Sequence, residues 1–166
     1  FNDLFCLQDP RVHTISVGAA RPSDLDLHLE AVGLLQRAAE LLPPVQQRLG
    51  DAELVALGED WLTTWQQGLP PWQETPGQIN IPILLWLHNL IEAWGMEGYA
   101  KARYALLGNG SHWFPGANAD ALDGEVSEAA LREALVQSPW CDQIPSLIRD
   151  LRKRLQGLPG QRLTSA

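Results

Sequence analysis

The chain has 166 residues, of which 45% are hydrophobic, and its formal net charge is −8 with an isoelectric point near 4.8. A chain of this size buries a sizeable core, and one or two small domains are expected. The acidic balance argues against nucleic acid or an anionic membrane surface as the main partner, because phosphate groups would be repelled. No hydrophobic run reaches the roughly 18 residues that span a bilayer. These features predict a globular cytoplasmic protein.

The two cysteines, Cys6 and Cys141, are far apart and lack the spacing of a redox or metal motif. This favours reduced thiols in a cytoplasmic protein over a disulfide. Seven tryptophans are a high count for this length, and all lie near expected helices or turns. Core packing therefore explains them better than a stacking platform for sugars or bases.

The chain opens with residues 2–8, which are typical of the end of a helix. After Asp9-Pro10, the segment VHTISV at 12–17 is the one convincing β-strand in the sequence. A single strand leaves its backbone groups unpaired, so we expect its partners to come from further chain or from a second copy. Because the helical pattern is already under way at Phe1, we expect a fragment of a longer protein.

A turn of small residues, GAAR at 18–21, leads from this strand directly into a helix, for which Ser23 and Asp26 have capping-box spacing. Such a turn is an anion-binding arrangement, because backbone N–H groups, a guanidinium and the positive end of the helix face outward together. Taken without further context, an ordinary strand–helix turn explains the pattern better than a phosphate site.

The segment 34–70 is predicted to be a helical connector. Pro43-Pro44 is expected to break 33–50 into short helices, and Gly58 to separate a second pair of helices within 51–67. Proline and glycine then concentrate at 68–77, where we place the last internal boundary.

The most hydrophobic run of the chain, 81–94, follows that boundary. Asn80 is a good N-cap, and Pro82 lies in the first turn, where its missing N–H has no helical partner to lose. Hydrophobic side chains cover most of the helix circumference, which predicts a central helix buried on several sides. Much of this unit recurs: Thr75-Pro76 before Ile81-Pro82 is echoed by Ser138-Pro139 before Ile144-Pro145.

Gly95 permits a turn after this run. Three further helices are expected: 97–107, a capped helix at 127–136 that begins with Ser127, and 144–155. An irregular connection with one helical turn is predicted at 111–124, and a frayed tail at 157–166. The basic residues of 149–154 are interpreted as the solvated face of the last helix, in preference to a patch for RNA or a membrane.

The residues show no catalytic constellation. The four histidines are scattered, with no HExxH motif and no nucleophile elbow. His88 and Glu92 share one helix face, and a polar stripe explains them better than half of a metal site. The oxygen-bearing residues between Asn118 and Glu125 depart from the spacing of a calcium loop and are interpreted as surface polar residues.

Two separate stretches nevertheless resemble one family. PRVHTISVGAARPSDLDLHL, at 10–29, resembles the last barrel strand and following helix of aldo/keto reductases. TPGQINIPILLWLHNLIEAWGMEGYAKARYALLGNGSHWFPGANADAL, at 75–122, and SPWCDQIPSLI, at 138–148, resemble the C-terminal extension of the branch that carries a helical ferredoxin-like domain.

This resemblance implies a mainly α fold with one β-strand. Residues 1–33 would be the last strand and helix of a (β/α)8 barrel, and 34–70 a helical connector. Residues 71–156 would be a multi-helix ferredoxin-like bundle, and 157–166 a tail. The whole protein would then be an NADPH-dependent carbonyl reductase, and this chain its C-terminal fragment.

The resemblance also implies a cofactor-binding corner that holds the adenosine phosphate of NADPH. Gly18, Ala19 and Ala20 would line the phosphate pocket, and Arg21 would pair with the 2′-phosphate. Asp24 and His28 would lie near the adenine. Arg21 stands one place later than the commonest arginine of the family, and His28 stands where asparagine is common.

The family's catalytic residues precede everything in this sequence, so we expect no catalytic residue here and the N-terminal barrel of the same protein as partner. In cluster-bearing relatives, cysteines precede the two prolines in ferredoxin-type spacing. Here Thr75 and Ser138 stand directly before them, and no cysteine lies between Cys6 and Cys141. We therefore expect no iron–sulfur cluster, with Trp72, Trp140 and aliphatic side chains filling the space.

A competing hypothesis is a stand-alone helical interaction module without catalysis. It would bind a partner protein, or a second copy, through the edge of the strand at 12–17 or through a tryptophan-rich surface. Pairing of 12–17 on both sides would indicate a barrel, whereas an intermolecular ladder or a disordered segment would indicate the module.

Overall fold

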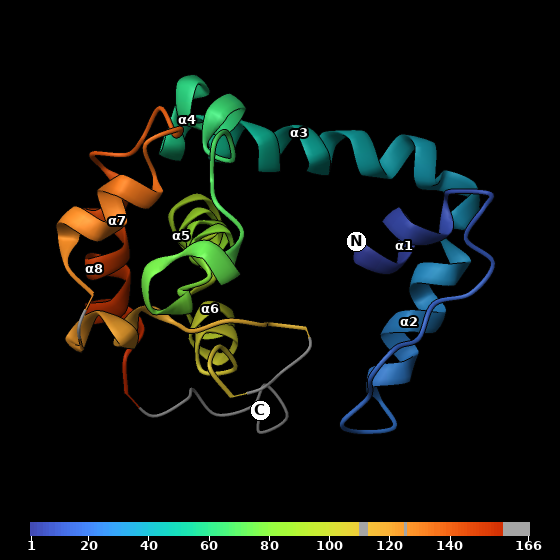
Figure 1. Ribbon diagram of the computed structural model, residues 1–166. Coiled ribbons are helices and arrows are strands. Elements are labelled where there is room, and N and C mark those ends of the chain that lie inside the picture. Colours follow the sequence, from blue (N-terminus) through green and yellow to red (C-terminus); the bar gives the residue numbers. More distant parts are fainter. Residues whose placement is uncertain (110–112, 125, 158–166) are drawn as a thin grey trace. The chain divides into compact units, whose positions relative to one another are not determined.

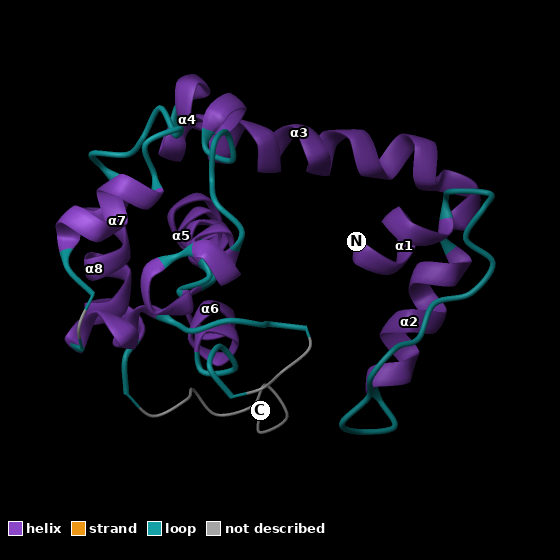
Figure 2. Ribbon diagram, viewed as in Figure 1, coloured by secondary structure: helices purple, strands orange, loops and turns teal. Residues whose placement is uncertain are grey.

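The computed structural model describes residues 1–109, 113–124 and 126–157. Across these ranges the chain is mainly helical, as expected, and Figure 2 shows helices and loops with no strand among them. Two compact units are present, Phe1–Asp51 and Ala52–Ala166. In the described part, no helix has both the length and the hydrophobicity that crossing a bilayer requires.

The first unit contains two short helices and most of a third. Helices α1 (Asn2–Leu7) and α2 (Asp24–Gly33) contact each other, and a 3₁₀ turn at Leu35–Arg37 leads into α3 (Ala38–Leu57). Its core is small: Leu4, Ala38 and Leu42 are buried. The helical end expected at 2–8 is confirmed as α1. None of the residues of α2 is buried within this unit.

The strand expected at 12–17 is not formed. These residues belong to no helix, turn or ladder, and one isolated bridge, Ile79 with Ala117, is the only β-type pairing within the described ranges. β-Branched side chains favour an extended backbone, but a strand also needs a neighbour to take up its N–H and C=O groups. The described part of this chain supplies no such neighbour.

The break expected at Pro43-Pro44 does not occur either, because α3 continues through both prolines. The two prolines remove only the amide donors that would reach the carbonyls of Ala39 and Glu40, close to the beginning of the helix. The expected break at Gly58 is confirmed: this residue has a φ of 79°, and α4 (Glu59–Thr64) begins directly after it. A positive φ suits glycine, which has no Cβ to clash.

The second unit is built around α5 (Ile81–Trp94), which lies at its centre in Figure 1 with α6 (Glu97–Tyr104) and α8 (Ile144–Leu155) in contact with it. Both ends of α5 form as predicted. Oδ1 of Asn80 accepts a hydrogen bond of 3.1 Å from the backbone N–H of Ile83, and Gly95 ends the helix with a φ of 65°. Buried residues point from it in several directions: Ile81, Leu84, Leu85, Leu87, Asn89, Leu90 and Ile91.

The repeated turn-and-helix unit becomes a pair of packed helices. Helices α5 and α8 contact each other, and each begins with an Ile-Pro pair whose isoleucine, Ile81 or Ile144, is fully buried. The predicted bounds 144–155 match α8. Helix α7 (Glu128–Ala134) is also confirmed, with Oγ of Ser127 accepting a hydrogen bond of 3.1 Å from the N–H of Ala130.

The remaining predictions for this unit concern its connections. The helix expected at 97–107 ends earlier, as α6 at Tyr104. A 3₁₀ turn at Ala119–Asp123 provides the helical turn expected in the connection that follows. The predicted tail lies outside the described residues except for Gly157.

Candidate functional site

The predicted cofactor corner begins at the turn before α2. Two consecutive backbone N–H groups, those of Ala20 and Arg21, donate hydrogen bonds of 2.9 and 3.0 Å to Oδ2 of Asp24. Nε of Arg21 lies 3.8 Å from the other carboxylate oxygen of Asp24. Ser23 makes no side-chain cap, so the capping box expected from Ser23 and Asp26 is not formed. The Asp24 carboxylate therefore holds the backbone of Ala20 and Arg21 against the beginning of α2.

This arrangement shows what the donors of the turn bind. Two N–H groups and a guanidinium converge on one carboxylate at the positive end of a helix, which is also how a phosphate oxygen is held. The donor set therefore fits a phosphate group. A bound phosphate would have to take the place of the Asp24 carboxylate, and Asp26 adds a second negative charge to the same helical turn.

The other predicted residues of the corner lie on either side of this turn. Gly18 and Ala19 are exposed in the extended segment that precedes it. His28 lies one helical turn beyond Asp24, where its Nδ1 pairs with Oδ2 of Asp3 on α1. The structure thus brings Ala20, Arg21 and Asp24 together, whereas His28 joins α2 to α1.

A hydrophobic groove of about 350 Å³ runs along the same unit. Asp3 and His28 contribute the polar part of its lining, and the other residues that line it are Leu7, Ile15, Val17, Leu25, Leu29 and Val32. Several of these side chains are well exposed; Leu29 exposes 69% of its surface. Large exposed hydrophobic patches mark interaction surfaces, so this groove is a candidate for such a contact.

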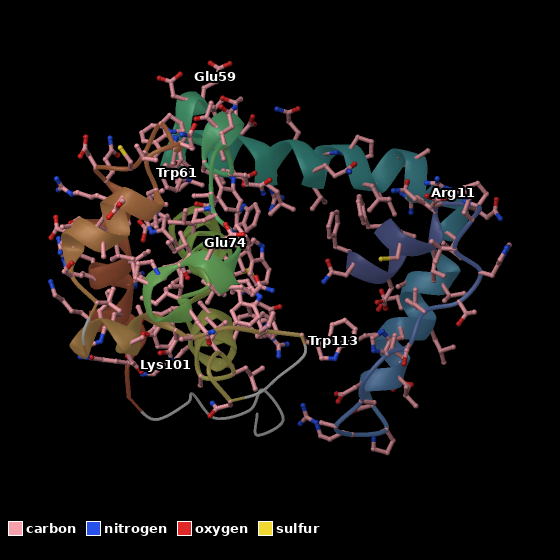
Figure 3. All side chains as sticks on the ribbon, viewed as in Figure 1. Arg11, Glu59, Trp61, Glu74, Lys101 and Trp113 are labelled. Atoms are coloured by element: carbon pink, nitrogen blue, oxygen red, sulfur yellow. The ribbon has the colours of Figure 1, made fainter. Side chains whose placement is uncertain are left out.

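A second groove, of about 260 Å³, lies entirely within the second unit, Ala52–Ala166, which is called the helical unit from here on. In this groove His88 and Glu92 of α5 face Trp61 and Trp140. The indole Nε1–H of Trp140 donates to Oγ1 of Thr64 at 2.9 Å, and the Trp140 ring meets that of Trp61 edge-on. Figure 3 shows Trp61 between α4 and α5. These two tryptophans pack helices together, as predicted, whereas Trp113 exposes 77% of its surface and departs from the core packing expected for all seven.

His88 and Glu92 do not act as a pair. Glu92 binds Arg154 of α8 at 2.7 Å, and the His88 ring lies edge-on to Trp61 with 6.0 Å between ring centroids. Burial lowers the pKa of His88; the nearby Arg154 lowers it further, while Glu92 raises it. His88 is thus a largely neutral side chain against an indole.

Two of the oxygen-bearing residues of the connection at 111–124, Asn118 and Asp120, have structural partners. Oδ1 of Asn118 accepts from the N–H of Asp120 at 3.0 Å, and the Tyr104 hydroxyl donates to Asp120 at 2.9 Å. Burial, first, and the Asp120 carboxylate, second, raise the pKa of Tyr104. Glu125 lies outside the described residues, and no group of three metal-ligating side chains occurs among those the structure describes.

The two residues that stand directly before the repeated prolines are both buried. The Thr75 hydroxyl lies 2.7 Å from the carbonyl oxygens of Trp72 and Ile79, and Oγ of Ser138 accepts from the N–H of Trp140 at 3.2 Å. Both hydroxyls therefore satisfy backbone groups in the turns that lead toward α5 and α8.

One feature of this unit was missed in the sequence. The Arg103 guanidinium lies over the rings of Tyr99 and Phe114, 4.7 and 5.6 Å from their centroids. The i, i+4 spacing of Tyr99 and Arg103 on one helix face could have indicated half of this cluster. Phe114 lies within the irregular connection predicted at 111–124, so its place could not be inferred from spacing.

The chain was compared with protein-family models, with curated proteins and with solved structures, and it matches none of them.

Proposed function

We propose that the chain is the C-terminal part of an NADPH-dependent aldo/keto reductase, in which 12–28 completes the adenosine-phosphate corner and the helical unit is a structural extension without iron–sulfur clusters. The observation that carries the proposal is the turn before α2, where the N–H groups of Ala20 and Arg21 and the Arg21 guanidinium surround one carboxylate. The sequence resemblance to that family supplies the identity of the anion.

In this function the turn binds the 2′-phosphate of NADPH. The Asp24 carboxylate releases the two N–H groups, and the phosphate takes its place with Arg21 as counter-ion. Asp24 is then free to rotate toward the adenine, beside His28. NADPH, when bound, supplies the hydride that reduces a carbonyl. The residues of this chain bind and orient the cofactor, and the acid–base residues of the reaction belong to the N-terminal barrel.

The hydrophobic groove of the first unit supports the same proposal. Leu25, Leu29 and Val32 of α2, together with Ile15 and Val17 of the extended segment, offer an uncovered hydrophobic surface. In a barrel this surface packs on neighbouring helices and strands, and 12–17 gains the strand partners that it lacks here.

The test is the cofactor preference of the gene product purified from its source cell. Arg21→Ala is expected to raise the KM for NADPH by about tenfold or more and to leave the KM for NADH almost unchanged, because only NADPH carries the 2′-phosphate. Arg11→Ala is the matched control, since it also removes one exposed arginine, which pairs with Asp9. Equal losses for both cofactors would refute the role of Arg21.

The same exposed hydrophobic groove also favours the second candidate, a helical interaction module that binds a partner protein. The two candidates differ in the size of the native product, which an antibody against the surface of α8 can measure. A product of at least about twice 18.4 kDa that reduces carbonyls with NADPH would support the reductase. A product of 18.4 kDa would exclude it and favour the module.

A further inference from the structure

Arg103 has an unusual environment for a charged side chain. It lies on α6, is half-buried, and stacks on Tyr99 of the same helix and on Phe114. Trp86 of α5 supports both rings, edge-on to Tyr99 and stacked with Phe114. Nε of Arg103 is buried and has no hydrogen-bond partner. Such a donor is costly to bury without an acceptor, so its environment calls for an explanation.

The contrast with the other arginines sharpens this point. Among the described residues, most arginines pair with a carboxylate: Arg11, Arg21, Arg37, Arg132, Arg149, Arg152 and Arg154. Arg103 forms no ion pair with any residue that the structure describes, although the chain has eight more acidic than basic residues. Arg48 also lacks one, but its side chain is exposed to solvent. Aromatic rings, rather than a carboxylate, hold the charge of Arg103 in place.

A groove of about 300 Å³ opens at this guanidinium. It is lined by Tyr99, Arg103, Leu106, Trp113 and Phe114, all from the helical unit. Trp113 exposes 77% of its surface and stands at the edge of the unit away from α7 and α8 (Figure 3). This volume is at the lower end of the range for small-molecule sites, and it suits one fused ring system.

We propose that this groove binds a small planar aromatic carboxylate. The aromatic lining stacks on the ring system of the ligand, and Arg103 pairs with its carboxylate, the partner that none of the described residues provides. Stacking on Tyr99 and Phe114 fixes the guanidinium before the ligand arrives, so little side-chain freedom is lost on binding.

Other classes of ligand fit less well. A cation would be repelled by Arg103 at the short range that the groove imposes. A polyanion such as nucleic acid needs several basic side chains in register, and the chain carries a net charge of −8. A neutral aromatic would stack but would leave the charge of Arg103 without a counter-ion. One negative charge on one ring system matches the one cation and the hydrophobic lining.

The test uses the full 166-residue chain and 2-naphthoate as the probe, with neutral 2-naphthamide as its matched analogue. Binding is followed through the indole N–H of Trp113 and the backbone amides of Tyr99 and Leu106 in ¹H–¹⁵N spectra. We expect these signals to shift and naphthoate to bind about tenfold more tightly than naphthamide. Equal affinities, or shifts confined to other residues, would overturn the proposal.

Two variants complete the experiment. Arg103→Met keeps an unbranched side chain as far as the position of Nε and removes the charged group, and it should abolish the preference for naphthoate. Arg48→Met makes the same change in net charge at an exposed site and should leave that preference intact. If Arg103→Met does not fold, Trp113→Ala decides, because a side chain so exposed contributes little to the core. Naphthoate affinity that is unchanged in Trp113→Ala would then overturn the proposal.

Discussion

The indole Nε1–H of Trp61 donates a hydrogen bond of 2.8 Å to Oδ1 of Asn89, and this bond joins α4 to the middle of α5. Both side chains are buried, with 6% and 5% of their surfaces exposed. A polar pair in this position is stable only while each group satisfies the other, since neither has access to bulk water.

Asn89→Leu should therefore destabilise the protein, although leucine has the same branched heavy-atom skeleton and is more hydrophobic. The substitution leaves the Trp61 N–H buried without an acceptor, which costs about 1–3 kcal/mol. The free energy of unfolding, measured by denaturant titration of the helical signal, checks this. Gln46→Leu, an exposed amide on α3, is the control and should change stability by less than about 0.5 kcal/mol. Equal stability of Asn89→Leu and the unmodified chain would contradict the role given to this pair.

Gly68 provides a second prediction, because another part of the backbone lies directly against it. A Cβ at this position would lie 2.1 Å from the carbonyl oxygen of Gln137, and the φ of Gly68 is +67°. Gly68→Ala must move the turn before Ser138 and adopt a disfavoured backbone angle, so we expect the free energy of unfolding to fall by about 2 kcal/mol or more.

Gly98→Ala is the opposite case. Gly98 lies in α6 with open space around it, and the higher helix propensity of alanine should stabilise the protein by up to about 1 kcal/mol. Similar melting temperatures for the two variants would show that the close approach of 68 to 137 is not maintained in solution.

These two relationships show where sequence reasoning succeeds and where it ends. The caps at Asn80 and Ser127 and the C-terminal glycine of α5 were predicted, because each depends on residues within one helical turn. The bond between Trp61 and Asn89 joins residues that are far apart in the sequence, and no local pattern specifies it. Local reasoning also fails at 12–17, because its β-branched residues favour a strand but the described part of the chain offers no partner strand.

The candidate corner shows a third kind of limit. The turn from Gly18 to Arg21 was predicted to present N–H groups and a guanidinium to an anion; in the structure these donors face Asp24, and binding of an external anion stays a prediction. Asp24 lies close enough along the chain to reach the donors of the turn, and it satisfies them internally. Competition of this kind between a side chain and a ligand depends on rotamers that residue spacing does not determine.

His88 makes the stability of the helical unit depend on pH. Burial, first, and Arg154 lower its pKa in the folded protein, and Glu92 opposes them. An unfolded histidine titrates near about 6.5, so below that pH the unfolded chain binds a proton that folded His88 resists. Stability should be full above about pH 6.5 and should decline as the pH falls from there toward the lower folded pKa.

The measurement is the free energy of unfolding between pH 7.5 and 5, taken for the unmodified chain and for His88→Gln. In His88→Gln the free energy of unfolding should fall less over this pH range than in the unmodified chain. His13→Gln removes an exposed histidine from the first unit and should keep the decline in full. Carboxylates with lowered pKa, such as Glu128 beside Arg149, titrate below this window and do not disturb the comparison. A pH profile that His88→Gln leaves unchanged would argue against a half-buried His88 with a lowered pKa.

The occupied turn before α2 leads to the last prediction. If Asp24 holds the N–H groups of Ala20 and Arg21, then removing its carboxylate should free them for an external anion. Asp24→Ala is therefore expected to increase the affinity of the chain for inorganic phosphate several-fold, as measured by the shifts of the Ala20 and Arg21 amide signals during a phosphate titration.

Asp26→Ala is the matched control. It removes an equal charge from the same helical turn but leaves the Asp24 carboxylate in place, so it should produce a smaller, purely electrostatic gain in phosphate affinity. Adding Arg21→Ala to Asp24→Ala should cancel the gain. If Asp24→Ala and Asp26→Ala increased phosphate affinity equally, the effect would come from net charge alone, and the turn would not be a formed anion site.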